Sequence, residues 1–177
     1  MKTLIINSVC GVGSTGRIAT DLLHTLRKQG HDCKIAYGIG TAKNVNPEDT
    51  IKINNKFGYY THNALSRITD KAGFYSARAT RGLINKIKVY DPDLIHLHNL
   101  HGYYINVKIL FEFLATANKP VIWTMHDCWP ITGHCTHFDL IGCSRWRDGC
   151  FKCPQKNEYP KSYVLDQSKE NYKLKKQ

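Results

Sequence analysis

The first 37 residues follow the order strand, glycine-rich turn, helix, strand, and this order constrains the fold more than any other feature. Apolar runs at residues 3–9 and 33–37 predict two buried strands. A helix is predicted between them from about residue 14, and Gly30 is placed to end it in the left-handed conformation. The apolar positions on one face of this helix are Ile18, Ala19, Leu22, Leu23 and Leu26. This order is typical of a parallel βαβ unit.

The alternation of strands and helices continues beyond this unit. The further elements predicted are a weak strand at 51–53, helices at 56–69, 76–89 and 106–117, and strands at 94–98 and 121–125. In the helix at 106–117 we expect Val107, Leu110, Phe111 and Leu114 to face the core. The pattern predicts an α/β fold with an open, mostly parallel Rossmann-like sheet and helices on both faces, followed by an irregular Cys-rich segment.

Composition narrows the class of protein. A length of 177 residues suits one domain, and a hydrophobic fraction of 42% excludes wholesale disorder. No apolar run is long enough for a membrane span, and the amino-terminal run turns polar too soon for a signal peptide, so we expect a cytoplasmic protein. The net charge of +11 favours phosphate-rich partners, namely nucleotides, an anionic membrane face or nucleic acid.

A glycine-rich turn at residues 11–16 follows the first strand and matches G-x-G-x-x-G. Glycines allow close approach to a phosphate, and a helix N-terminus offers free N–H groups. A dinucleotide site also needs an acid after the second strand, where residues 36–40 carry no carboxylate. The alternatives are a turn without a ligand and, as the favoured interpretation, a phosphate or sugar contact.

Histidines gather after the third and fourth clear strands. His96 and His98 share one face of a strand; His96 fits a core histidine, whereas His98, Asn99 and His101 are candidates for the site at the strand ends. After the fourth strand, the dipeptide His126-Asp127 could be a histidine supported by a carboxylate, or a cap for the next turn.

Four cysteines lie in a segment without regular apolar patterning. Their spacing is C-x7-C-x6-C-x2-C, and they are Cys135, Cys143, Cys150 and Cys153. Four thiolates can close a tetrahedral structural zinc site, with His134 and His137 as alternative ligands. Buried free thiols or a redox pair are the other interpretations.

The motifs together resemble a known family. Residues 8–19, 93–99 and 123–129 look like the amino-terminal half of bacterial glycosyltransferases of the GT-B, family 4 type, and residues 132–155 resemble a Cys-rich insertion in a subgroup of these enzymes. The resemblance implies one half of a GT-B fold and retaining sugar transfer without a catalytic metal, often in surface-polysaccharide assembly. The second domain, which binds the nucleotide sugar, does not follow in these 177 residues, so we expect the chain alone to be inactive.

The resemblance also assigns domains and site residues. It implies an acceptor-side domain at 1–126, a Cys-rich insertion of that domain at 127–155, and a basic tail at 156–177 that leads to a second domain. By position, His126 lies near the donor sugar and Asp127 supports it. The residues implied to face the donor diphosphate are Gly13, Ser14, Thr15, Gly16 and Arg17, and those implied on the acceptor side are His98, Asn99 and His101.

Three hypotheses follow. The leading one is the acceptor-side half of a retaining glycosyltransferase, which uses a nucleotide sugar and a glycan or lipid-linked acceptor at the inner face of the membrane. The alternative is a zinc-stapled binding module that contacts phosphate-rich or nucleic-acid partners, although the basic residues form no single stripe. An oxidoreductase is disfavoured by the missing acid. The lysines of the tail are either a solvated helix end or a contact with an anionic membrane.

Overall fold

The computed structural model describes residues 1–176, and a five-stranded sheet forms its centre. The strands are β1 (Lys2–Asn7), β2 (Asp32–Tyr37), β3 (Thr50–Lys52), β4 (Leu94–Leu97) and β5 (Val121–Trp123). They lie in the order β3-β2-β1-β4-β5, and all pairings between them are parallel. The predicted open parallel sheet is therefore confirmed, and its order changes direction between β1 and β4 as in doubly wound folds.

The helices agree with the predicted alternation to within a few residues at each end. They are α1 (Gly13–Lys28), α2 (Lys56–Thr69), α3 (Ala77–Tyr90), α4 (Val107–Thr116) and α5 (Ser168–Lys176), with short 3-10 turns η1 (Pro47–Asp49), η2 (Trp129–Ile131) and η3 (Asp139–Ile141). Gly30 follows α1 with a φ of 78°, as expected for a left-handed helix end. Each of the described helices is too short or too polar to span a bilayer.

Helices cover both faces of the sheet because successive strand residues point to opposite sides. Ile5 and Ile35 pack against α1, where Ala19 and Leu23 are buried. The other face holds the larger part of the core, in which Leu4, Ile6 and Leu97 pack with buried residues of α3 and α4. This arrangement is the predicted one.

Two predicted core positions are wrong. Ile18 is 42% exposed, because the buried side of α1 runs through the small residues Gly16 and Ala19; Gly16 packs on the loop after β1, and Ala19 packs on the sheet. Phe111 is 39% exposed and lies against the edge strand, with its ring centroid 5.3 Å from that of Trp123.

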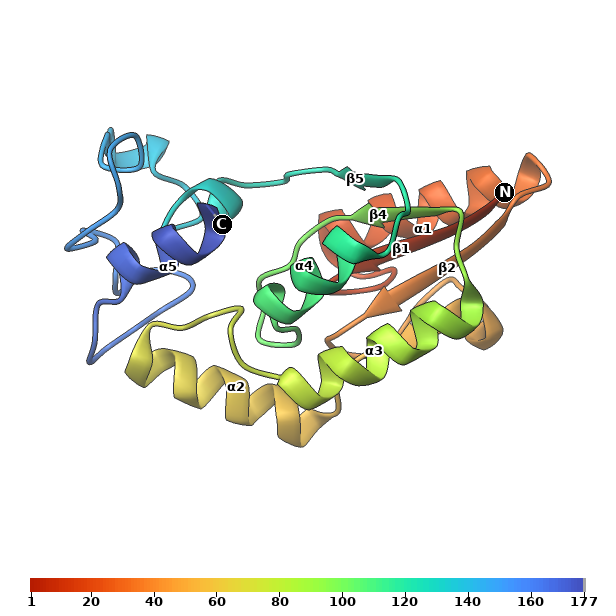
Figure 1. Ribbon diagram of the computed structural model, residues 1–177, viewed down its shortest axis with the longest axis horizontal. Helices are drawn as coiled ribbons and strands as arrows, with labels where there is room; N and C mark the ends of the chain where they lie inside the picture. The colour runs from red at the N-terminus through yellow and green to blue at the C-terminus, as the bar shows by residue number, and fades with distance from the viewer. Residues whose placement is uncertain (177) are drawn as a thin grey trace.

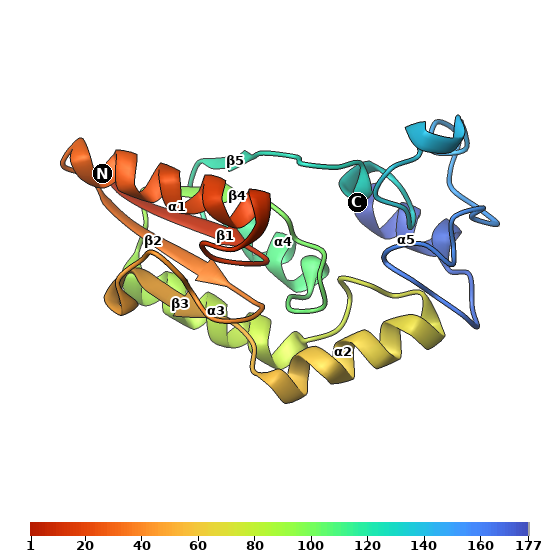
Figure 2. The same cartoon turned by 180° about the vertical axis from the view of Figure 1, so that it is seen from behind.

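The segment after β5 extends beyond the carboxyl ends of the strands. Figures 1 and 2 both show residues 124–176 at the end of the molecule opposite the N-terminus, with α5 beside the turn that contains η2. The carboxyl-terminal end of α2 lies at the same end of the molecule. The chain then turns back, so that α3 begins beside the start of α2 and runs along the same long edge in the opposite direction. Gln177, the last residue of the predicted tail, lies outside the described residues.

Candidate active site

Three loops meet at the carboxyl edge of the sheet, because β1, β4 and β5 are neighbours there. The backbone N–H of His98 donates to the carbonyl of Ile6 at 2.9 Å, and the N–H of Asn99 donates to Oδ1 of Asn7 at 3.2 Å. The loop after β4 is thus fixed to the end of β1. The glycine-rich turn, the histidine loop and the segment after β5 form one continuous rim.

The three glycines of the first loop are each needed at their position for a different structural reason. Gly11 has a φ of 67°, and a Cβ there would lie 1.9 Å from the carbonyl oxygen of Lys43. A Cβ at Gly16 would lie 3.1 Å from the Val9 side chain, so this glycine permits close packing of the helix on the loop. Gly13 has a φ of 65° and open space around it. Only Gly13 therefore leaves room for a ligand at the start of α1.

The first turn of α1 is open and contains no acid. Its N-cap residue is Val12, whose side chain has no acceptor for the free N–H groups of the helix. Ser14 and Arg17 are exposed and Thr15 is half-buried. A helix N-terminus of this kind attracts anions through its N–H groups and partial positive charge.

The end of β2 is closed to a dinucleotide ribose. Tyr37 ends the strand, and a Cβ on the following Gly38 would lie 2.0 Å from Cγ of the buried Tyr104. An aromatic ring thus packs directly on this glycine, and residues 36–40 offer no carboxylate there. The geometry agrees with the sequence in disfavouring NAD binding.

Two histidines of the rim are hydrogen-bonded to each other. Nδ1 of His98 lies 2.9 Å from Nε2 of His126, and the rings stack with their centroids 5.1 Å apart. Burial, followed by the neighbouring His96 and His126, lowers the pKa of His98 to about 4. His98 is therefore neutral near pH 7, and the contact joins one donor nitrogen to one acceptor. The other ring nitrogen of His98, Nε2, is buried without a hydrogen-bond partner among the described residues.

His96 belongs to the core side of this cluster, as expected. Its Nε2 lies 2.8 Å from the hydroxyl of Thr124, and its ring contacts that of His98 at a centroid distance of 4.3 Å. Burial lowers the pKa of His96, and His126 lowers it further. His96 thus supports the ring of His98 from behind.

The carboxylate of Asp127 is paired with His101, whereas the sequence placed it as support for His126. Oδ2 of Asp127 lies 2.6 Å from Nε2 of His101, and Oδ1 accepts the backbone N–H of Trp129 at 2.9 Å. Burial alone would raise the pKa of Asp127, but these hydrogen bonds lower it below the usual value. The prediction failed because side chains of adjacent residues leave the chain in different directions.

His101 is buried and has a partner on each ring nitrogen. Its Nδ1 lies 3.1 Å from the hydroxyl of Tyr159, which comes from the predicted tail. Burial raises the pKa of Tyr159, so its hydroxyl stays protonated and can donate to Nδ1 while Nε2–H donates to Asp127. The tail thus returns to the rim and fixes the His101–Asp127 pair.

Asn99, by contrast, is half-buried, and its backbone carbonyl accepts a hydrogen bond from the hydroxyl of Tyr104 at 2.7 Å.

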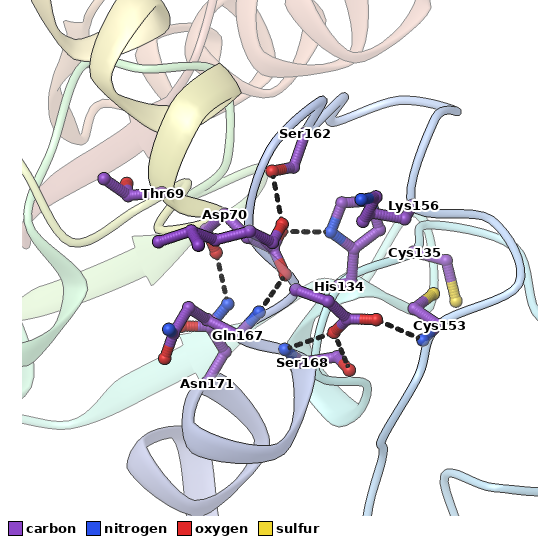
Figure 3. A network of polar contacts seen from close by, with 12 residues as sticks. Thr69, Asp70, His134, Cys135, Cys153, Lys156, Ser162, Gln167, Ser168 and Asn171 are labelled. Carbon is purple, nitrogen blue, oxygen red and sulfur yellow. Dashed lines mark hydrogen bonds and ion pairs between the residues drawn. The ribbon is translucent and has the colours of Figure 1, made fainter.

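The four cysteines of the Cys-rich segment line one small cavity, together with the aromatic rings of Phe138, Trp146 and Phe151. The side chains of Cys135 and Cys153 lie next to each other (Figure 3), and their interaction lowers the pKa of Cys135 to about 6 and raises that of Cys153. Within residues 1–176, no group of three or more His, Cys, Asp or Glu side chains is arranged as the ligands of one metal ion. The structural zinc therefore stays a prediction.

Comparison with known proteins identifies the family. The model of Glycosyltransferase Family 4 matches residues 15–153, which is most of the chain. The chain belongs to glycosyltransferase family 4. It is also 30% identical over 170 residues to the putative colanic acid biosynthesis glycosyl transferase WcaC of Escherichia coli (strain K12), with 90% of this chain covered. The chain spans 41% of the length of that relative, and no solved structure matches it.

The family 4 match ends at Cys153, and a buried polar network joins the segment beyond it to α2 (Figure 3). Asp70, the C-cap of α2, is 2% exposed and contacts Nδ1 of His134 through Oδ1. Its Oδ2 accepts the backbone N–H of Gln167 at 2.8 Å, and its carbonyl accepts the side-chain amide of Asn171. His134 is thus bound to a carboxylate and not to the cysteine cluster.

Sequence reasoning missed this network because Asp70 and His134 are 64 positions apart. The one available signal was an Asp directly after a predicted helix, where a left-handed residue is common. One lysine of the tail differs from a solvated helix end, whereas Lys169, Lys173 and Lys176 are exposed. Nζ of Lys175 donates to the carbonyls of Trp129 and Thr132 at 2.8 and 3.0 Å, and burial lowers the pKa of this lysine to about 7.

Proposed function

We propose that this family 4 chain is the acceptor-side half of a retaining glycosyltransferase. It would serve the transfer of a sugar from a nucleotide sugar to a glycan or lipid-linked acceptor, in surface-polysaccharide synthesis on the cytoplasmic side of the membrane. The carrying observation is that the open start of α1, the His98–His126 pair and the His101–Asp127 pair lie on one rim of the sheet. The name of the relative, a colanic acid biosynthesis glycosyl transferase, supports the assignment to polysaccharide synthesis.

The start of α1 would receive the donor diphosphate. Gly13 keeps the approach open, and the N–H groups that begin at Ser14 and Thr15 point to the helix start. Arg17 is exposed one turn further on and can pair with a phosphate oxygen. Gly16 contributes close packing of the helix. In the reaction, the bond between the anomeric carbon and the diphosphate oxygen breaks, a bond to the acceptor oxygen forms, and the acceptor's hydroxyl proton leaves with the diphosphate.

His126 would be the group that touches the donor sugar. It is half-buried, and its Nε2 is bound to His98. The second ring nitrogen, Nδ1, is therefore the one that can bind a sugar hydroxyl. His98 acts through His126 as a positioning residue, because it is neutral and cannot repel the positive charge that develops on the sugar.

The roles proposed for the remaining rim residues follow from their partners. Both nitrogens of His101 are occupied, so His101 holds Asp127 and does not bind the acceptor directly. Asp127 in turn accepts the N–H of Trp129 and fixes the start of η2. Asn99 is the residue of the acceptor set whose side chain is available at the rim.

The test uses a full-length chimera in which this chain replaces the matching segment of the E. coli relative. Transfer of a radiolabelled sugar to a membrane extract is measured for the chimera and for the isolated chain. We expect transfer by the chimera only, and a loss on the order of 100-fold in kcat for His126→Ala. His137→Ala, at an exposed histidine of the Cys-rich segment, is the matched control and should retain activity. Transfer by the isolated chain, or full activity of His126→Ala, contradicts the proposal.

A further inference from the structure

Helix α2 has its apolar side turned outward. Its buried residues are the polar His62 and Ser66. Its exposed residues include Phe57 at 80%, Tyr60 at 66% and Ile68 at 52%. These three positions recur at helical spacing and form a continuous stripe along the helix. A surface helix normally buries this stripe, so the exposed face of α2 is built for a contact outside the chain.

The segment at residues 163–165 enlarges this apolar face. The N–H of Tyr163 donates to the carbonyl of Arg67 at 2.7 Å, and that of Leu165 donates to the carbonyl of Ile68 at 3.0 Å. Tyr163, Val164 and Leu165 are 56%, 61% and 44% exposed. Two parts of the sequence thus combine in one apolar surface at the carboxyl-terminal end of α2.

The surroundings of this surface are strongly basic. Residues 50–90 contain eight Lys and Arg residues and one carboxylate, Asp70, which is buried against His134. Helix α3 exposes Arg78, Arg81 and Lys88 along the same edge of the molecule, and it begins beside the amino-terminal end of α2 (Figures 1 and 2). The amino-terminal end of the apolar stripe therefore adjoins a positive patch, and residues 50–90 expose no carboxylate. Exposed carboxylates flank this surface at Asp91, which pairs with Lys119, and at Asp166.

We propose that α2 and α3 form a membrane-docking surface that takes an anionic bilayer. Phe57, Tyr60 and Ile68 insert among the acyl chains near the headgroups, while Arg78 and Arg81 pair with lipid phosphates. With 14 residues, α2 has the length of a helix that lies in the interface and not of one that crosses it.

A bilayer fits this surface better than a protein partner does. It offers an apolar layer and a phosphate layer next to each other, which is the pattern that α2 and α3 carry. A protein partner would need an apolar groove for α2 with acidic side chains beside it for α3, whereas a bilayer presents both layers everywhere along its surface. The inference goes beyond the proposed function and rests on the surface alone, so it can fail while the transferase assignment stands.

The experiment is flotation of the chain with vesicles of equal parts phosphatidylglycerol and phosphatidylcholine, compared with pure phosphatidylcholine. We expect binding to the anionic vesicles only, and weaker binding at high salt. Arg78→Gln with Arg81→Gln should weaken binding about thirtyfold. The matched control, Lys28→Gln with Lys169→Gln, removes the same charge from exposed sites outside the surface and should bind like the unchanged chain.

The apolar part is tested separately. Phe57→Ser with Tyr60→Ser should weaken vesicle binding on the order of tenfold. Leu140→Ser with Ile141→Ser is the control, because these residues are 75% and 49% exposed on η3. Circular dichroism checks that each variant is folded. Absence of vesicle binding, equal binding to neutral vesicles, or equal losses in variants and controls would overturn the proposal.

Discussion

Replacing Asp70 by asparagine should weaken the attachment of the carboxyl-terminal segment to the rest of the domain. The carboxylate contacts Nδ1 of His134 and accepts the N–H of Gln167 at 2.8 Å. Asp70 has a φ of 58°, and asparagine tolerates the left-handed region well. The substitution therefore removes one acceptor oxygen and leaves the backbone unstrained. Alanine, by contrast, would strain the backbone at this φ.

The expected loss follows from the burial of both partners. The side chain of His134 is 0% exposed and that of Asp70 is 2% exposed, so water cannot replace the lost acceptor. An unsatisfied buried donor costs about 1–3 kcal/mol, and a hydrogen bond to a charged group contributes about 1.5–3 kcal/mol. Asparagine keeps one acceptor oxygen, so only one of the two donors loses its partner. We therefore expect the free energy of unfolding to fall by about 3 kcal/mol. This is a large part of the stability of an ordinary domain.

The measurement is unfolding in urea followed by tryptophan fluorescence, which reports on the buried Trp129 in the same segment. Asp139→Asn is the matched control, because its carboxylate lies 4.0 Å from His137 and its side chain is 64% exposed. That change should stay within about 0.5 kcal/mol of the unchanged chain. A loss below about 1 kcal/mol for Asp70→Asn, or equal losses for the two variants, would refute the reasoning.

Three further predictions concern pH, metal and packing. The pKa of His98 is about 4 in the folded chain and about 6.5 when unfolded, so the unfolded chain binds the proton first and stability falls by up to about 3 kcal/mol from pH 6.5 to 4. His98→Gln should remove this part of the pH dependence in urea titrations, and an unchanged profile contradicts it. Elemental analysis should find about one zinc per chain and less in Cys143→Ser; a trace of zinc with all thiols titrating freely excludes the site. Gly38→Ala should lower the free energy of unfolding by about 1–3 kcal/mol, because the added Cβ would clash with the Tyr104 ring. Gly82→Ala, on the open surface of α3, should instead raise the stability slightly. Equal melting temperatures for the two variants would contradict this prediction.

The sheet could be predicted from the sequence because its strands are short apolar runs separated by amphipathic helices. Parallel strands buried on both faces need such runs, and β1 and β2 carry them clearly. The range of helix α2 was predicted from the sequence, but its orientation was not. The spacing of Phe57, Tyr60 and Ile68 defines an apolar face, and only the structure shows that this face points outward.

The rim could be predicted in position but not in its pairings. Strand ends place Gly13, His98 and His126 at one edge, which topology alone dictates. Which side chains touch depends on the turns after the strands, and these carry no periodic signal. Asp127 was assigned to His126 because the two are adjacent in sequence, yet its partner is His101.

The two pairs of the rim connect the same two loops. His98 and His101 follow β4, and His126 and Asp127 follow β5, so each pair is a hydrogen-bonded link between the two loops. The second link, His101–Asp127, is also bound by the hydroxyl of Tyr159, which contacts Nδ1 of His101. Tyr159 follows the cysteine cluster, and Asp70 anchors the segment after it, so Tyr159 is one route by which a change in that cluster reaches the His101–Asp127 pair. We therefore expect loosening of the Cys-rich segment to remove the Tyr159 hydroxyl from Nδ1 of His101, while Asp127 keeps Nε2 of His101 and the N–H of Trp129 as partners. Such a change would alter the His101–Asp127 pair without any contact between the cysteines and a substrate.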